Sequence, residues 1–380
     1  MREGIEGNIA IEQYVELHQR TGVRFSWGFG SGRADLPRLL ETAKQIEGVG
    51  ALLAFEGPNE PNNWGIKFQG EEGGRNGSWV AVAKLQRALN EAVHADALLK
   101  KYPVWSISEG GAETDNVGLQ FLKIPADAGT IFPAGTAFAD FANVHNYIYH
   151  PNSSGLNDNK TWNAADPGPA CRVDGLYGEY GVTWAKHFKG YSTNELLKLP
   201  RVTTETGATI GGPVTEEIHG LNLLSMYLDQ YKRGWSHTAV YLLRDRVDEG
   251  GNQKFAFFRP DYSPRLAAVY LHNLTTILGD RGALETPESL DYTIENQPAT
   301  IHDLLLQRSD RSFQLIVWDE RIKETDSVTV QFGAPAPVIE LYDPTIGIAP
   351  TKRFENARFI PLVLSNHPAI IEIAARQTSR

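Results

Sequence analysis

An Asn-Glu-Pro triplet, Asn59 to Pro61, follows the apolar run Ala51-Leu52-Leu53-Ala54, so it lies where a buried strand opens into a loop. An amide stands beside the Glu60 carboxyl group, and a proline stiffens the exit of the chain. A carboxylic acid at such a strand end suits a residue that must hold a proton over a sugar ring. A second strand-like run, Val202-Thr203-Thr204, also ends in an acid, Glu205.

Two carboxyl groups about 5 Å apart cleave a glycosidic bond with retention: one protonates the leaving oxygen and the other attacks the anomeric carbon. Two acids this close do not both ionise cheaply, so one holds a proton and the other stays an anion. We predict Glu60 as acid/base and Glu205 as nucleophile. Taken alone, Glu205 fits an exposed loop residue equally well. Glu109 is a rival nucleophile that ranks lower, because adjacent strands leave too little room for a sugar.

Polar residues near these acids are expected to support them. Asn59 is predicted to bond a sugar hydroxyl next to the anomeric centre, and Tyr147 to donate to the Glu205 anion and aim it. His145 lies two residues earlier on the same strand face and belongs to the same network. Glu56 is predicted to be a buried carboxylate that supports Arg2 or His145. No His or Cys stands at ligand spacing from His145, so the sequence predicts no metal site.

The elements that must position these residues alternate between helix-like and strand-like segments from residue 8 to about 245. This α/β pattern predicts βα units, a parallel sheet and a (β/α)8 TIM-type barrel, whose strand ends all face one mouth. Six strands are expected, near residues 25, 53, 106, 143, 203 and 240. Residues 1–5 read as the tail of a seventh, so the barrel is expected to lack its first strand and helix.

Helix signals give way to short alternating runs after about residue 282. This pattern predicts an antiparallel β-sandwich. The expected domains are therefore a catalytic barrel over residues 1–281 and a sandwich over 282–380. A polar excursion at residues 151–175 is expected to be a functional loop, because loops of that length in compact domains usually carry function.

Composition excludes several classes of function. The 380 residues carry a formal charge of -10 without a basic cluster, which argues against nucleic acid and anionic membrane partners. No apolar run reaches membrane-spanning length. The single cysteine, Cys171, excludes an intrachain disulfide. The first residues do not form a signal peptide, which favours the cytoplasm; a missing upstream leader would instead favour a secreted or periplasmic protein.

The sites resemble clan A of the glycoside hydrolases, the (β/α)8 superfamily with its acid/base in Asn-Glu-Pro after strand four and its nucleophile at the end of strand seven. The matching segments are Glu56 to Pro61, His145 to Tyr147, Thr204-Glu205 and Tyr241 to Asp245. Within the clan the chain is most similar to family 39, which includes β-xylosidases, α-L-iduronidases and exopolysaccharide hydrolases. The resemblance implies that Arg2, at the end of strand two, lies near the nucleophile. Gly57-Pro58 departs from that family, which more often has an apolar residue and Trp there.

The sequence thus predicts a retaining glycosidase that acts on an oligo- or polysaccharide without a cofactor. Candidate stacking residues are Trp27, Trp64, Trp162 and Tyr241, and candidate polar contacts are Arg2, Asn59, His145, Tyr147 and Arg244. The alternative is a carbohydrate-binding or scaffold protein with a gapped, inactive barrel. The edge left by an absent strand offers a pairing surface for a homodimer. The sequence does not name the sugar or decide between exo and endo action.

Overall fold

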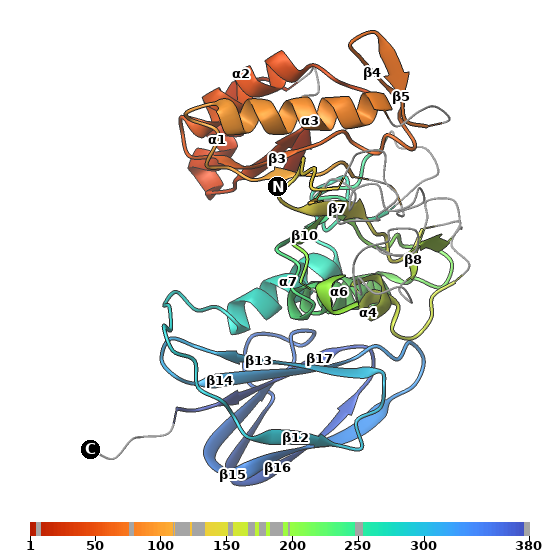
Figure 1. Cartoon of the computed structure of the whole chain (residues 1–380). Helices are drawn as coiled ribbons and strands as arrows, with labels where there is room; N and C mark the ends of the chain where they lie inside the picture. Colours follow the sequence, from red (N-terminus) through yellow and green to blue (C-terminus); the bar gives the residue numbers. More distant parts are fainter. Residues whose placement is uncertain are drawn as a thin grey trace. The chain divides into compact units, whose positions relative to one another are not determined.

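The computed structural model describes residues 1–4, 9–75, 80–108, 110, 122–123, 134–150, 155–165, 172–174, 180–182, 193–196, 198–247 and 254–375 (Figure 1). These residues gather into two compact units. Unit 1 comprises Met1–Ser153, Asp166–Thr206 and Arg233–Tyr241, and unit 2 comprises Ser154–Ala165, Gly207–Lys232 and Leu242–Arg380. The rival nucleophile Glu109 lies outside the described residues.

Parallel strands form the centre of unit 1. One sheet has the order β1 (Arg2–Gly4), β2 (Phe25–Gly28), β3 (Leu52–Glu56) and β6 (Val104–Trp105). A second has the order β11 (His237–Val240), β10 (Arg201–Thr206) and β7 (Ala142–His145). Every pairing in the two sheets is parallel.

A parallel bridge between Trp105 and Phe141 joins the β6 segment to the β7 segment. The strands therefore follow one another in chain order from β1 to β11. They match the six expected strands and the expected tail of a seventh. Closure of this set into a complete barrel stays a prediction.

Amphipathic helices α1 (Ile11–Thr21), α2 (Leu36–Glu47) and α3 (Val80–Ala95) lie beside the sheet that begins with β1 (Figure 1). Helix α2 contacts β2 and β3, helix α3 contacts β6, and α1 packs on α2. The Asp35 side chain accepts a hydrogen bond from Arg38 N and so caps the start of α2. Gly22, with φ of 73°, ends α1 in the left-handed conformation that glycine adopts without strain. Unit 1 also contains the short helix α5 (Thr193–Leu196) and two hairpins. The hairpins pair β4 (Ile66–Phe68) with β5 (Glu71–Gly73), and β8 (Arg172–Asp174) with β9 (Tyr180–Val182).

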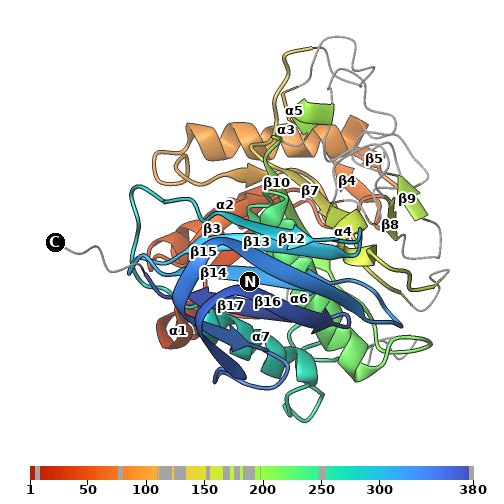
Figure 2. The same cartoon turned by 90° about the horizontal axis from the view of Figure 1, so that it is seen from below.

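A curled antiparallel sheet forms most of unit 2 (Figure 2). Its strands are β12 (Tyr292–Glu295), β13 (Ile301–Gln307), β14 (Phe313–Asp319), β15 (Asp326–Tyr342), β16 (Lys352–Leu364) and β17 (Pro368–Ile373). The order is β12-β15-β17-β14-β13, and β16 pairs with β15. The antiparallel strands were expected, but two of them merge into the 17-residue β15, which changes register between Gln331 and Ala336. The division into two packed sheets stays a prediction.

The alternating residues of β14 explain why helices join this sheet. Leu315 and Val317 face the interior of the curl, whereas Ile316 and Trp318 pack against α6 (Glu216–Lys232) and α7 (Leu266–Ile277). The sequence places both helices in the barrel domain, which it ends at residue 281. In the structure they belong to unit 2, because their apolar side chains share a cluster with the sheet.

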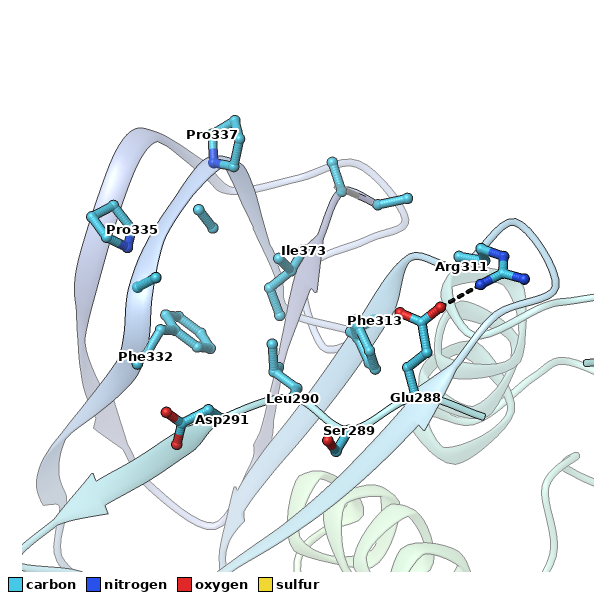
Figure 3. A pocket seen from close by; sticks show the side chains of 15 residues that line it. Glu288, Ser289, Leu290, Asp291, Arg311, Phe313, Phe332, Pro335, Pro337 and Ile373 are labelled. Atoms are coloured by element: carbon cyan, nitrogen blue, oxygen red, sulfur yellow. Dashed lines mark hydrogen bonds and ion pairs between the residues drawn. The ribbon is translucent and has the colours of Figure 1, made fainter. Parts of the chain in front are cut away.

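Unit 2 also contains a cavity of about 600 Å³, with Leu290, Phe313, Phe332 and Ile373 along its wall (Figure 3). Glu288 and Arg311 form an ion pair at its edge. In the expected polar loop at residues 151–175, the structure contains helix α4 (Lys160–Ala165) and strand β8. No helix among the described residues combines the length and apolar character needed to cross a bilayer.

Candidate active site

The exit of β3 places the acid Glu60 by backbone contacts with the neighbouring segment. Glu60 N donates to the Ser108 hydroxyl at 3.3 Å, and a parallel bridge links Asn59 to Ser108. The Asn62 side chain accepts from Gly110 N and donates to Gly110 O. Glu60 itself has a φ of 39°, a left-handed conformation that is costly for a non-glycine residue. Such strain persists only where surrounding contacts enforce it, and here they aim the carboxylate.

A bulge in β10 places the second acid. The register with β7 shifts between Thr203 and Glu205, and the register with β11 shifts over the same stretch. In a regular strand, consecutive side chains point to opposite faces. The bulge instead brings both Thr204 and Glu205 into the cluster around His145.

The two predicted catalytic acids converge. Oxygen atoms of Glu60 and Glu205 and a ring nitrogen of His145 all lie within 4.8 Å of one another. His145 Nδ1 is 2.7 Å from Glu60 Oε1 and 3.5 Å from Glu205 Oε2. His145 is fully buried, while the Glu60 and Glu205 side chains keep 8% and 13% of their surface exposed. The acids are therefore mostly desolvated but still within reach of a ligand.

Arg2 and Tyr147 hold the Glu205 carboxylate. Arg2 Nη1 pairs with Glu205 Oε1, and the Tyr147 hydroxyl donates to Oε2 at 2.7 Å. Arg2 also donates to Asn59 Oδ1, and its Nε lies 3.0 and 3.2 Å from the two oxygens of Glu56. The structure thus joins Arg2 to Glu56, as predicted, and gives each oxygen of Glu205 a hydrogen-bond donor.

A second layer lies behind His145. Its Nε2 is 3.0 Å from the Thr204 hydroxyl, which donates to Glu56 Oε1 at 2.8 Å. Asn143 Nδ2 donates to the same hydroxyl at 3.0 Å. Asn63 Nδ2 donates to Glu60 Oε2 at 3.0 Å from the other side. The Thr204 hydroxyl, the Asn143 amide and His145 Nε2 therefore each have a partner that fixes their orientation.

The surroundings shift the titration of several groups. Burial acts to raise the pKa of Glu60, but the hydrogen bond and charge of His145, with Asn63 and Arg2, hold it below its usual value. Burial and the charges of Glu205 and Glu60 raise the pKa of Tyr147 well above its ordinary value, so its hydroxyl stays a donor. Burial opposes the charge of Arg2, yet Glu56 and Glu205 raise its pKa overall. Arg2 is thus a permanent cation.

Glu60, His145 and Glu205 also offer one metal-ligand atom each within 4.8 Å. The 2.7 Å contact between His145 and Glu60 is a hydrogen bond, which requires a proton where an ion would bind. The guanidinium of Arg2 already neutralises Glu205. This donor set fits a hydrogen-bonded acid pair better than a cation site.

The aromatic candidates of unit 1 differ in how much of the ring is exposed. Trp64 is 52% exposed in the loop that follows Glu60, and Tyr241 is half-buried with its ring edge-to-face with Tyr147. Trp27 was predicted to stack on a sugar, and this is wrong: it is 1% exposed, packs on Tyr14, and donates its indole N–H to Thr42. Its strand is buried on both faces, and the ring points to the helices.

Two other candidates belong to unit 2. One face of the Trp162 ring stacks on His302, with ring centroids 3.9 Å apart. The role of Trp162 in stacking a sugar stays a prediction. Arg244 donates to Pro260 O and lies over the Tyr262 ring. Its role in substrate binding stays a prediction.

Sequence reasoning did not identify Asn143, Asn63 or the part played by the Thr204 side chain. Asn143 stands two residues before His145 in an otherwise apolar strand, a spacing that places both on one face. That spacing was a usable signal. The part played by Thr204 depends on the bulge, and no residue in this segment predicts a bulge from the sequence.

Crowding behind β3 explains the Gly57-Pro58 departure. A side chain at Gly57 would place its Cβ 1.9 Å from Gln86 Oε1 and 2.8 Å from Ile107 N. Gln86 donates to Trp105 O and Phe138 O, so it cannot move without breaking both bonds. Glycine is therefore required where the resembling family has a larger residue.

Solved structures share this fold. A family 39 glycoside hydrolase from Bacteroides cellulosilyticus WH2 aligns with a TM-score of 0.61 at 15% identity, over 98% of this chain and 74% of that chain. The GH51 arabinofuranosidase from Xanthomonas axonopodis pv. citri gives 0.52 at 11% identity, over 95% and 78%. An endo-β-1,6-glucanase gives 0.53 at 10% identity, over 97% and 75%. No family model and no curated protein sequence matches the chain.

At such identities the likeness establishes a shared fold. This chain shares the fold of these glycoside hydrolases, and the predicted resemblance to clan A is confirmed at the level of the fold. Family 39 is among the similar structures, as the sequence indicated.

Proposed function

We propose that this protein is a retaining glycoside hydrolase that cleaves an oligo- or polysaccharide by double displacement. The observation that carries the proposal is the separation of the two acids. Oxygens of Glu60 and Glu205 lie within 4.8 Å. Retaining enzymes hold their carboxyl groups about 5–5.5 Å apart, whereas inverting enzymes need roughly 6.5–9.5 Å to admit a water. The glycoside hydrolases of similar fold support a carbohydrate substrate.

Each acid has surroundings suited to its part. In the first step Glu205 attacks the anomeric carbon while Glu60 protonates the departing oxygen, which leaves a glycosyl ester on Glu205. In the second step Glu60 takes a proton from water, and the water oxygen displaces Glu205. Arg2 and Tyr147 fix both oxygens of Glu205 before the attack, so little reorganisation is needed in the transition state.

The lowered pKa of Glu60 favours its ionised form, whereas an acid catalyst must deliver a proton. The His145 hydrogen bond lowers the pKa of Glu60, and the proton that Glu60 delivers lies in this 2.7 Å contact. The pair keeps one proton whichever atom carries it. A leaving oxygen that approaches Glu60 draws this proton onto the carboxyl group and then away from it.

Substrate contacts follow from what remains accessible. Asn59 Nδ2 donates one hydrogen to the Ser31 hydroxyl at 2.9 Å, and its second hydrogen can reach a sugar hydroxyl near the anomeric centre. Trp64 follows the acid in the chain and offers an exposed ring for stacking a sugar. Tyr241 is the candidate stacking residue beside Tyr147.

A panel of aryl glycosides with different leaving groups tests the proposal. Glu205→Gln should lower turnover of every substrate by at least about 10³-fold, because the nucleophile is lost. Glu60→Gln should lower kcat/KM strongly for poor leaving groups and only slightly for dinitrophenyl glycosides, whose leaving group needs no proton. Glu91→Gln, on the exposed face of α3, is the matched control. Proton NMR of the first product should show the anomer of the substrate.

A fluorosugar trap adds a direct readout. A 2-deoxy-2-fluoro glycoside with a good leaving group should leave one sugar attached to the peptide that contains Glu205, detected by mass spectrometry. An inverted product, or equal residual signal in wild type and both variants, contradicts the proposal. The second result would favour a sugar-binding protein without turnover.

A further inference from the structure

The Thr204 hydroxyl has one hydrogen to donate and two lone pairs with which to accept. Its neighbours are the carboxylate of Glu56 at 2.8 Å, Asn143 Nδ2 at 3.0 Å and His145 Nε2 at 3.0 Å. The Asn143 amide oxygen lies farther away, at 3.2 Å, and carries no charge. The single hydrogen therefore goes to Glu56, which is the nearest and the only charged acceptor of these.

This assignment fixes the proton on the far side of the imidazole. With its hydrogen given to Glu56, the hydroxyl can only accept from Asn143 Nδ2 and from His145 Nε2. Nε2 must then carry a hydrogen. If it did not, two lone pairs would face each other at 3.0 Å in a fully buried site.

The same argument fixes the protonation of His145 Nδ1, which faces Glu60. When Nε2 holds the only ring hydrogen, Nδ1 presents a lone pair to Glu60 Oε1 at 2.7 Å. An ionised Glu60 would repel it, so one further proton is held between the two atoms. Without the Thr204 hydroxyl, the ring hydrogen could move to Nδ1 and satisfy an ionised Glu60 alone.

We propose that Thr204 is a positioning residue that fixes the tautomer of His145 and thereby keeps Glu60 supplied with its catalytic proton. Thr204 does not touch the substrate and acts only through His145. The bulge in β10 makes this arrangement possible, because it lets the Thr204 side chain point into the site together with that of Glu205. The inference deepens the proposed function and rests on it for its kinetic consequence.

The charged and titratable groups around His145 come from every strand packed against it. They are Glu60 and Glu56 from the β3 segment, Glu205 from β10, Arg2 from β1 and Tyr147 after β7. Arg2 lies against Glu56 and Glu205 and balances part of their charge. At Nε2 the structure places the Thr204 hydroxyl, which accepts the ring hydrogen.

Imidazole nitrogen NMR tests the tautomer directly and needs no activity. Protein labelled with nitrogen-15 in histidine is titrated with pH, and the His145 signals are assigned by their loss in His145→Asn. We expect Nε2 to stay protonated throughout in the wild type. In Thr204→Val we expect the neutral ring to carry its hydrogen on Nδ1. Thr204→Ser keeps the hydroxyl and should restore the wild-type pattern.

The kinetic test is the pH profile of kcat/KM for a glycoside with a poor leaving group. The basic limb should move about one unit toward lower pH in Thr204→Val, the scale expected for one hydrogen bond to a charged pair, and return in Thr204→Ser. Thr206→Val is the matched control: its buried hydroxyl lies on the same strand but donates to Asn146 O. It should leave the limb in place.

The outcomes are separable. An unprotonated Nε2 in the wild type overturns the inference even if Thr204→Val fails to fold. So does a tautomer that Thr204→Val leaves unchanged, or a basic limb that Thr206→Val moves as far as Thr204→Val does. If the wild type hydrolyses no glycoside, the proposed function fails, while the nitrogen spectra still decide the part played by Thr204.

Discussion

The Tyr147 hydroxyl donates a hydrogen bond of 2.7 Å to Oε2 of Glu205. Glu205 lies in β10, and Tyr147 follows β7, which pairs with β10 in parallel. The phenol can therefore hold the carboxylate without any movement of the backbone. Because burial keeps the hydroxyl protonated, it remains a donor throughout the pH range in which glycosidases are assayed.

Tyr147→Phe removes this donor and leaves the ring in place. A hydrogen bond to a charged group contributes about 1.5–3 kcal/mol, so we expect kcat/KM to fall by about 10- to 150-fold. The free energy of unfolding should change little, because Glu205 keeps its contact with Arg2. Tyr231→Phe, at an exposed position on α6, is the control for the assay. Unchanged kinetics in Tyr147→Phe would remove Tyr147 from the site.

Gly28→Ala tests the packing of Glu56, the carboxylate that holds Arg2. A Cβ at Gly28 would lie 2.8 Å from Glu56 Cβ and 3.2 Å from Glu56 O, both on the adjacent strand. Overpacking of this kind costs roughly 1–3 kcal/mol of stability. The shifted Glu56 should also release Arg2 and lower kcat. Urea unfolding and aryl glycoside kinetics measure the two effects.

Gly347→Ala is the matched control for that substitution, since a Cβ there meets no atom within 4 Å. Its stability should stay within about 0.5 kcal/mol of the wild type. Equal stability and kinetics in both alanine variants would show that Glu56 can shift without weakening its contact with Arg2.

The convergence of Glu60 and Glu205 could be predicted because parallel strands end at one edge, whatever the loops between them do. The orientation of Trp27 could not. Its strand, Phe25–Gly28, is buried at all four positions, so no alternation of polar and apolar residues marks the inward face. The part played by Thr204 was hidden for a related reason, since a bulge changes which face a residue occupies without changing the residue types.

The sequence also did not reveal that α6 belongs to unit 2. Helix α6 buries eleven residues distributed around its axis, including the polar residues His219, Asn222 and Asp229. A helix that is buried on several sides has no single apolar face from which its packing partner could be predicted. Its contacts with Ile316 and Trp318 of the sheet became visible only in the structure.

Asp229→Asn tests a buried carboxyl pair in unit 2. Burial and the neighbouring Glu320 raise the pKa of Asp229 well above its usual value. Asp229 Oδ2 and Glu320 Oε1 are both buried and have no other hydrogen-bond partner among the described residues, so we expect a proton on Asp229 to lie between the two carboxyl groups. A raised folded-state pKa stabilises the fold below the unfolded pKa of about 3.9, and this stabilisation is lost as pH rises through the folded value.

The amide of Asp229→Asn donates to Glu320 at every pH and needs no shared proton. We therefore expect a higher Tm than wild type at pH 8 and a smaller difference at pH 5. Thermal unfolding at the two pH values measures this. Asp261→Asn, an exposed aspartate in the same unit, should not reproduce the pH-dependent gain. A lower Tm for Asp229→Asn at both pH values would mean that the pair does not share a proton.

His219 gives unit 2 a stability that weakens in acid. Burial lowers its pKa from 6.5 to about 4, although its Nε2 donates to Phe255 O at 3.1 Å. The unfolded chain takes up a proton as pH falls below about 6.5, whereas the folded chain resists until about 4. The free energy of unfolding therefore decreases across that window, by about 2 kcal/mol between pH 7.5 and 5.

His219→Gln keeps a donor for Phe255 O and removes the titration. Urea unfolding at pH 7.5, 6 and 5 should show a shallower loss of stability in this variant than in the wild type, and the two curves should approach each other in acid. His272→Gln, at an exposed position on α7, should follow the wild type. Since both substitutions delete one imidazole, only the buried position should change the slope. Parallel curves for wild type and His219→Gln would show that the ring takes up its proton as readily in the folded chain as in the unfolded one.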